Sequence, residues 1–179
     1  MFYSSKIFFK VGFTPKYGTA IVGFVNMIST FGSVFLLGKF GRKAILWVFS
    51  FVMAIDLVAL GVAYIYVDNS VCKILAVVFV CMFVMFFEFS LGPVPWIYMS
   101  EIMTDKGLSI AVLLNWIFTL VMAIVTPYVI SGALFIVFGA FCIVCALFSL
   151  FILKETKGLT EAEVAVLYSK EKEKYHNLE

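Results

Sequence analysis

The sequence predicts an all-α membrane protein with five transmembrane helices and part of a sixth. Hydrophobic residues make up 64% of the 179 residues and charged residues only 13%, against about 25% charged in ordinary soluble domains. A soluble core of this length cannot bury so much apolar surface, so the excess must face lipid. Five apolar runs also approach the roughly 20 residues that cross a bilayer core about 30 Å thick. The net charge of +2 is too small to indicate nucleic acid as a partner.

The apolar runs set the order of the elements along the chain. Residues 1–13 are apolar but too short to span, and we expect them to be the end of a further helix. The transmembrane bundle covers 17–153, with helices expected at about 17–38, 44–66, 73–99, 108–130 and 133–153. Only Ser131-Gly132 links the last two, which forces an antiparallel hairpin.

Lysine and arginine near the helix ends predict the orientation in the membrane. Nine of the thirteen lie on the side shared by the 39–43 link, the 100–107 link and the tail 154–179. We therefore expect a multi-pass integral membrane protein with a cytoplasmic C-terminus. We also expect its location to be the plasma membrane. In the tail, Thr160 and Glu163 have the spacing of a capping box, which predicts a short amphipathic helix.

The segment from 73 to 99 carries the most informative residues. Glu88 lies inside this apolar run, where a carboxylate costs about 2.5–3.5 kcal/mol and usually faces a polar cavity. Gly92-Pro93-Val94-Pro95 then breaks the helix, and a broken helix is tolerated in a membrane only where its freed carbonyl groups face protein or water. Together these features predict a polar path through the membrane.

Two asparagines share the depth of Glu88. At about 1.5 Å per residue, Asn26, Glu88 and Asn115 fall in the middle third of the bilayer on three different helices, and we expect them to converge on one pocket. Amide and carboxylate groups suit a neutral, polyhydroxylated ligand, and Trp96 and Trp116 add aromatic faces. For Asn26 alone, a purely structural hydrogen bond between helices is an equal alternative.

Asp56 is a second carboxylate in the middle of a span, without an evident partner, so both a structural role and a role in transport remain open. Cys142 and Cys145 lie in an apolar run and are expected to pack rather than react. His176 is the only histidine. No nucleophile, metal-ligand or cofactor motif is present, so we expect no enzyme, no catalytic residue, no metal and no cofactor.

Several motifs in combination resemble the sugar porters of the major facilitator superfamily. They are Gly41-Arg42-Lys43, Gly92-Pro93-Val94-Pro95-Trp96, Ser100-Glu101-Ile102, Asn115-Trp116 and Glu155-Thr156-Lys157-Gly158. The resemblance implies that the five spans correspond to helices eight to twelve of a twelve-helix carrier and that 1–13 is the end of helix seven. It implies sugar-binding roles for Asn26, Phe87, Glu88, Trp96, Asn115 and Trp116. It also implies a hinge at Gly92, Pro93 and Pro95, and an inner-face ion-pair cluster of Arg42, Lys43 and Glu101.

The chain departs from the family pattern at several places, one of which is Gly38-Lys39-Phe40, where the family often has Asp or Glu just before Gly-Arg. The link Met103–Gly107 lacks the usual Pro and Arg, and Lys106 is the candidate replacement for that Arg. Lys154 stands where the family has Pro. The predicted function is transport of a hexose or similar sugar by alternating access, this chain being the C-terminal half and the N-terminal half being separate or missing. The alternatives are a truncated, non-transporting paralogue acting as a membrane partner or regulator, or a degenerate gene product.

Overall fold

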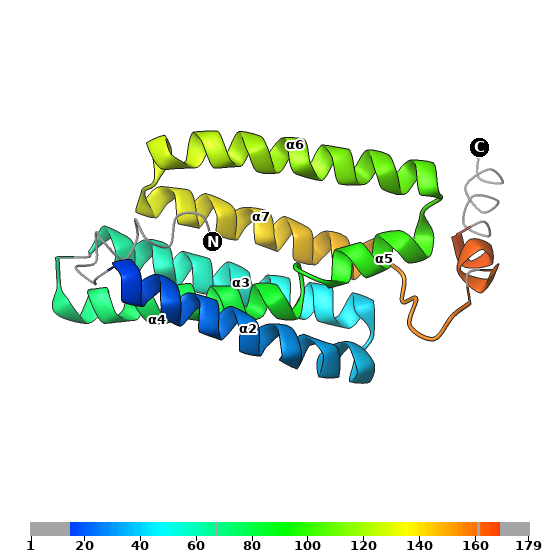
Figure 1. The fold of residues 1–179 in the computed structure, drawn as a ribbon, viewed down its shortest axis with the longest axis horizontal. Helices are drawn as coiled ribbons and strands as arrows, with labels where there is room; N and C mark the ends of the chain where they lie inside the picture. The colour runs from blue at the N-terminus through cyan, green and yellow to red at the C-terminus, as the bar shows by residue number, and fades with distance from the viewer. Residues whose placement is uncertain (1–14, 67, 161, 169–179) are drawn as a thin grey trace.

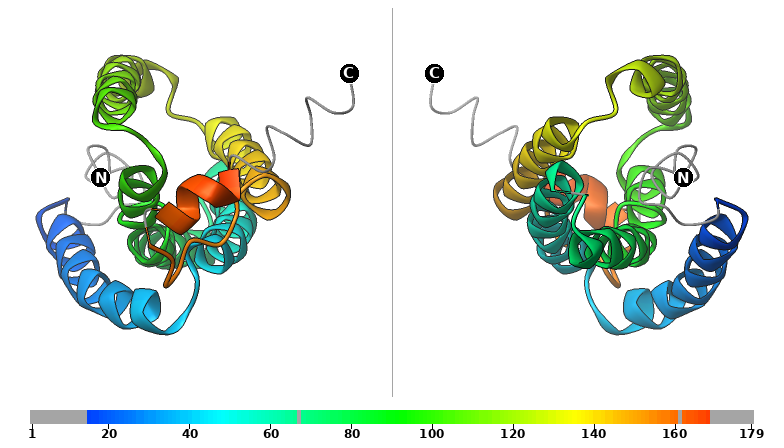
Figure 2. Two further views of the ribbon diagram at one scale, coloured as in Figure 1. Left: turned by 90° about the vertical axis from the view of Figure 1, so that its right-hand side faces the viewer. Right: turned by 90° about the vertical axis from the view of Figure 1, so that its left-hand side faces the viewer.

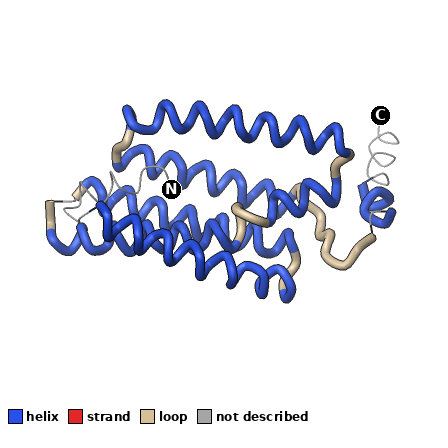
Figure 3. The backbone as a smooth tube through the Cα atoms, viewed as in Figure 1, coloured by secondary structure: helices blue, strands red, loops and turns tan. Residues whose placement is uncertain are grey.

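The computed structural model describes residues 15–66, 68–160 and 162–168, and these residues form helices and links without a β-strand (Figures 1 and 3). Five of the helical segments are long and apolar enough to cross a membrane. The expectation of an all-α membrane fold with five spans is confirmed. The expected part-helix at 1–13 lies outside the described residues.

The spans follow one another up and down along the bundle. Their helices are α2 (Pro15–Lys39), α3 (Arg42–Ile65), α4 (Ser70–Phe89), α5 (Val94–Ile102), α6 (Asp105–Val129) and α7 (Gly132–Phe151). The helices α4 and α5 together make one span, Val71–Ile102. A further short helix over 162–168 follows the last span.

The helices of all five spans begin one to three residues earlier than the hydropathy pattern indicates. Helices α3 and α6 start at the polar residues Arg42 and Asp105, two and three residues before the apolar runs that begin at 44 and 108. Polar residues can occupy a first helical turn when its free N–H groups find acceptors or an acidic group. Asp105 supplies an acid in the first turn of α6, and the first turn of α3 is capped by a residue described below.

Helix α3 is the centre of the bundle, and it packs closely against α7. Three glycines allow the two backbones to approach. A Cβ added to Gly61 would lie 2.7 Å from the carbonyl oxygen of Gly132, and one added to Gly132 would lie 2.6 Å from that of Gly61. At Gly139 the added Cβ would lie 3.1 Å from the carbonyl oxygen of Ala54. Small residues at such interfaces let transmembrane helices pack tightly.

Apolar side chains of α3 form the core together with α7 and α4. Tyr64 packs edge-on against Phe135 of α7, with ring centroids 5.4 Å apart, and Phe49 contacts Phe86 and Phe89 of α4 at 6.1 and 5.7 Å. The main buried cluster comprises Val22, Leu57, Leu60, Ala63, Tyr64, Ala76, Val80, Val84 and Phe135. It ties α2, α3, α4 and α7 into one body.

The remaining long helix, α6, stands apart from this body. None of its residues is buried. In the end-on views of Figure 2 the helices form an open C, with α2 and α6 at its two ends and α4 and α5 between them. The pair α4–α5 therefore lies between the two helices that carry Asn26 and Asn115.

The α3–α7 contact predicts unequal effects of two alanine substitutions. Gly61→Ala forces the backbones of α3 and α7 apart, and we expect a loss of about 1–3 kcal/mol, as for other overpacking changes. Gly23→Ala is the matched control, because a Cβ there meets nothing within 4 Å and alanine is the better helix former by up to about 1 kcal/mol. Thermal unfolding in nanodiscs, followed by circular dichroism, measures both. Equal midpoints for the two variants would show that α3 and α7 are not in close contact.

Candidate functional site

A hydrogen-bonded polar group joins α2 to α4 in the middle of the span. Asn26 Nδ2 donates to Glu88 Oε1 at 2.5 Å, and Thr30 Oγ1 lies 3.3 Å from Glu88 Oε2 and 2.9 Å from the carbonyl oxygen of Asn26. Asn26 and Glu88 are half-buried and Thr30 is exposed. The carboxylate therefore has two donors and remains accessible from one side.

The break between α4 and α5 follows one residue after Glu88. The carbonyl oxygen of Phe87 accepts from the N–H groups of Ser90 at 3.1 Å and Gly92 at 2.8 Å, and Ser90 Oγ donates to the carbonyl oxygen of Phe86 at 2.9 Å. Pro93 is the N-cap of helix α5, and Pro95 is the second residue of that helix. The break leaves these carbonyl groups paired, as a non-helical segment in a membrane requires.

Gly92 links the break to the carboxylate. A Cβ at Gly92 would lie 3.5 Å from Glu88 Oε2 and 3.3 Å from the carbonyl oxygen of Phe87. The lack of a side chain therefore leaves space beside the carboxylate. The hinge role of Gly92, Pro93 and Pro95 stays a prediction.

Two of the expected aromatic residues lie on the same pair of helices. Phe87 is 37% exposed and its ring stacks on that of Phe83, with centroids 6.2 Å apart. Trp96 on α5 is 39% exposed. Both present apolar rings at the surface of the bundle close in sequence to Glu88.

The other two expected residues lie on α6. Asn115 and Trp116 are exposed, Trp116 at 62%, and within the described residues no hydrogen bond joins Asn115 to Asn26 or Glu88. The structure thus brings together Asn26 and Glu88 and places Phe87 and Trp96 on the same two-helix span. The convergence of Asn115 and Trp116 on this group stays a prediction.

A second polar group lies at one end of the bundle, which we call the Arg42 end. Arg42 Nη2 pairs with Glu101 Oε1 at 3.0 Å, both side chains being mostly buried. Thr156, itself 1% exposed, donates from Oγ1 to Glu101 Oε2 at 2.5 Å. The expected association of Arg42 with Glu101 is present. The described contact of Lys43 in this group is made by its backbone N–H, which donates to Glu155. An ion-pair role for the Lys43 side chain stays a prediction.

Glu155 is the residue of this group that sequence reasoning missed. Its Oε1 accepts from the N–H of Arg42 at 2.8 Å and its Oε2 from the N–H of Lys43 at 3.1 Å, so the carboxylate caps the first turn of α3. A Cβ at Gly41 would overlap this carboxylate. The sequence does contain an indication of this role. Helix α3 begins after Gly41, which has no side chain to accept from the first N–H groups, so an acceptor must come from elsewhere in the chain.

The next residues extend the same contact to α2. Lys157 Nζ donates to the carbonyl oxygen of Gly38 at 2.8 Å, in the last turn of α2. The N–H of Lys157 also donates to Glu155 Oε1 at 3.1 Å. The segment 155–157 thus contacts the C-terminal end of α2, the N-terminal end of α3 and Glu101 of α5.

The short helix over 162–168 is fixed to the same end. The hydroxyl groups of Tyr98 and Tyr168 are hydrogen-bonded, and Tyr98 also bonds the backbone of Lys154. Lys154 Nζ donates to the carbonyl oxygen of Leu167 at 3.0 Å and lies 5.3 Å from the centroid of the Tyr168 ring. Lys154, which departs from the family pattern, therefore holds this helix.

The predicted capping box of this helix is confirmed. The N–H and the hydroxyl of Thr160 both donate to Glu163 Oε2 at 2.8 Å, and the N–H of Glu163 donates in return to Thr160 Oγ1 at 3.4 Å. Donation from the backbone and side chain of Thr160 lowers the pKa of the Glu163 carboxyl.

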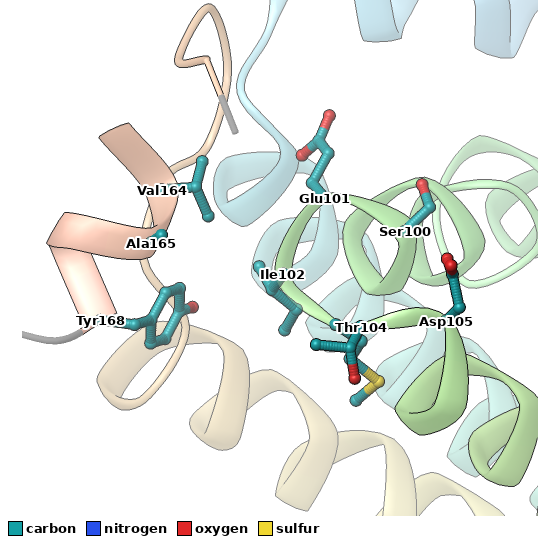
Figure 4. A pocket seen from close by; sticks show the side chains of 9 residues that line it. Ser100, Glu101, Ile102, Thr104, Asp105, Val164, Ala165 and Tyr168 are labelled. Carbon is teal, nitrogen blue, oxygen red and sulfur yellow. The ribbon is translucent and has the colours of Figure 1, made fainter. Parts of the chain in front are cut away.

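A hollow of about 440 Å³ opens between the short helix and the α5–α6 link. Figure 4 shows Val164 and Tyr168 on one side and Ser100, Glu101 and Asp105 on the other. Because both oxygens of Glu101 are already bonded to Arg42 and Thr156, the hollow belongs to the Arg42 end rather than forming a separate acidic site.

Comparisons with known proteins agree on one family. The sequence profile described as "Sugar (and other) transporter" matches residues 1–168. The chain is 35% identical to the Sugar transporter ERD6-like 6 of Arabidopsis thaliana, over 94% of this chain and 38% of that protein. It is also 35% identical to the Facilitated trehalose transporter Tret1 of Anopheles gambiae, over 88% of this chain and 22% of that protein.

Solved structures give the same result. The inward-open xylose transporter XylE from E. coli matches with a TM-score of 0.78 and 29% identity, over 93% of this chain and 40% of that one. A double Trp mutant of XylE matches with a TM-score of 0.82. The chain thus spans no more than about two fifths of the length of these relatives. They are named as transporters, which confirms the expectation that the chain is not an enzyme.

The cap on α3 predicts a local change when Glu155 is replaced. Glu155→Ala removes the acceptor of two N–H groups, and losing a cap costs about 0.5–2 kcal/mol. We expect the amide hydrogens of Arg42 and Lys43 to exchange roughly 2- to 30-fold faster, since about 1.4 kcal/mol corresponds to a factor of ten. Hydrogen exchange with mass spectrometry measures this.

The matched control is Glu163→Ala, which removes the cap of the short helix instead. It should speed exchange in 162–168 and leave Arg42 and Lys43 unchanged. Unaltered exchange of these two amides in Glu155→Ala would show that Glu155 does not cap α3.

Proposed function

Since the chain belongs to the sugar transporter family, we propose that it forms the C-terminal half of a carrier that moves a hexose or similar sugar across the membrane. Such carriers work by alternating access, in which one half rocks against the other around a site at the midplane. The five spans supply one wall of that site, and an N-terminal half supplies the other. The sugar and the lipid bilayer are then the partners of this chain.

The observation that carries the proposal is the hydrogen-bonded pair of Asn26 and Glu88. An amide offers a donor and an acceptor, and a carboxylate accepts up to four hydrogen bonds. Sugar hydroxyl groups both donate and accept, so they can bond to either side chain. Because the pair is half-buried rather than sealed, a ligand can reach it without unfolding the bundle.

The aromatic residues complete the proposed site. A pyranose ring has apolar faces between its hydroxyl groups, and the exposed rings of Phe87 and Trp96 can cover them. Asn115 and Trp116 would approach from α6, which lies across α4 and α5 from α2 (Figure 2). The polar groups of α2 and α6 would then hold the two edges of one sugar, with Glu88 between them.

The Arg42 end supports a role in the rocking motion. We place this end on the cytoplasmic side, from the distribution of lysine and arginine. Partly exposed ion pairs contribute little once they are solvated, so the Arg42–Glu101 pair can open and reform as the halves move. Lys43 would contribute its charge to the same cluster. Gly92–Pro95 would absorb the change in direction between α4 and α5.

The second candidate is a membrane partner or regulator that transports nothing. The observation that favours it is the unpaired face of α6, which has no buried residue and could dock on the helices of another membrane protein. The two candidates differ in whether the complementary half restores transport, and that difference can be tested.

Reconstitution separates the candidates. Liposomes that contain this chain alone should take up D-glucose and L-glucose at equal rates, because one half provides only one wall of the site. Adding the first six helices of the ERD6-like relative should restore a preference for a D-sugar. A D-over-L preference of the chain alone would contradict the half-carrier proposal, and no preference in any mixture, across a panel of hexoses, would support the regulator.

The proposed site predicts which side chains bind sugar. Glu88→Ala and Asn115→Ala should each weaken sugar binding by roughly 10- to 150-fold, because a hydrogen bond to a charged or buried polar group contributes about 1.5–3 kcal/mol. Saturation-transfer NMR with the two halves together in nanodiscs measures the binding. Asp68→Ala is the matched control, since Asp68 is an exposed acid in the link between α3 and α4. Binding unchanged by Glu88→Ala would remove Glu88 from the site.

A further inference from the structure

Asp56 lies far from both polar groups described above. It is fourteen residues into α3, so at about 1.5 Å per residue it is roughly 21 Å from the start of the helix and near the middle of the span. Its side chain is 5% exposed. Neither carboxyl oxygen has a hydrogen-bond partner, and neither touches solvent. In this respect it is the opposite of Glu88.

The surroundings of Asp56 are apolar. Met53 and Leu60 lie one turn before and one turn after Asp56 on the same side of α3, and they are 1% and 2% exposed. Leu57, the next residue in the chain, is 3% exposed. The burial comes from the described bundle itself. Asp56 therefore does not depend on a further helix or on a second protein to be removed from water.

The free energy of burial decides the charge of this carboxyl group. An isolated ionised carboxylate in an apolar interior costs tens of kcal/mol by Born solvation, whereas an unpaired neutral polar group costs roughly 2–7 kcal/mol. Protonation makes the carboxyl group neutral and so removes most of the free-energy cost of burying it. The neutral acid is the form that this site can accommodate.

A positive side chain could neutralise Asp56 instead, but no described one is placed to do so. Helices α2, α4, α5 and α7 pack around α3. The titratable groups of α2 lie in its end turns, and Glu88 of α4 is bonded to α2. Among the residues whose side chains the structure describes, no ion pair or hydrogen bond reaches Asp56 from the titratable groups of these helices or of α3. These groups are Tyr17, Lys39, Arg42, Lys43, Tyr64, Cys72, Lys73, Cys81, Glu88, Tyr98, Glu101, Cys142 and Cys145.

A bound metal cation is also a poor match. Hard cations need six or more oxygen ligands, and among the described residues no three His, Cys, Asp or Glu side chains come together. Both oxygens of Asp56 also lack any hydrogen-bonding neighbour. A proton is the one cation that needs no further ligand.

We propose that Asp56 is a proton-binding site within the bundle, separate from the Asn26–Glu88 group. The carboxylate takes a proton from hydronium, so one O–H bond forms as another breaks and a water molecule leaves. In the conformation described here the site is closed and holds its proton. A motion that lets water reach this side of α3 allows the proton to leave, so the site can couple proton movement to a change in conformation.

The scarcity of aspartate makes a direct test possible. The chain has three aspartates, Asp56, Asp68 and Asp105, and the last two are exposed. Cell-free synthesis of the full chain into nanodiscs with ¹³C-labelled aspartate gives three carboxyl signals in solid-state NMR. At pH 7 we expect one signal of a neutral acid and two of carboxylates. The neutral signal should disappear in Asp56→Asn and persist in Asp68→Asn.

Three carboxylate signals at pH 7 would overturn the proposal, and so would a neutral-acid signal that persists in Asp56→Asn. Should Asp56→Asn fail to insert, Asp68→Asn and Asp105→Asn assign the third signal by elimination. The experiment contains no sugar and measures no transport. A failure of the proton site and a failure of the sugar site are therefore distinguishable.

Discussion

Polar groups within a lipid bilayer must find their partners inside the protein, and this constraint determines where the chain can depart from a continuous helix. The break after Phe89 is possible because the carbonyl oxygen of Phe87 accepts two N–H groups and Ser90 bonds back to the preceding turn. Glu88 is tolerated because Asn26 and Thr30 reach it from α2. The carboxylate and the helix break therefore rely on the same short segment, which couples the geometry of α5 to the polar pair.

The same constraint explains the Arg42 end. Helices α2, α3 and α5 all end or begin there, and each leaves unpaired backbone groups. Glu155 pairs with the first turn of α3, Lys157 with the last turn of α2, and Thr156 with Glu101. Three consecutive residues thus pair with backbone groups at the ends of α2 and α3 and with the side chain of Glu101 in α5. A change in the relative positions of these helices must break several of these bonds together, which makes this end suited to two discrete arrangements rather than a continuous range.

Sequence patterns could predict the structural features that depend on a single segment of the chain. Hydropathy gave the five spans because burial in lipid requires about 20 apolar residues whatever their neighbours are. The role of Glu155 could not be predicted in this way, because it caps a helix that begins 113 residues earlier in the chain. The depth of Asn115 was likewise readable from its place in the run, but its distance from Glu88 depends on how α6 sits against the bundle. Helix α6 has no buried residue that could fix it there.

The two intramembrane acids show why depth alone does not assign a role. Glu88 and Asp56 are both carboxyl groups near the middle of a span, and both qualify as functional residues by that criterion. Glu88 has donors on a neighbouring helix and an accessible side, so it can exchange one hydrogen-bond partner for another. Asp56 has neither donors nor access. A group of the first kind can recognise hydroxyl groups, whereas a group of the second kind can respond only to a proton and to opening of the bundle. The two acids differ in their surroundings because each occupies a different kind of face on its own helix, Glu88 a partly accessible face of α4 and Asp56 a buried face of α3.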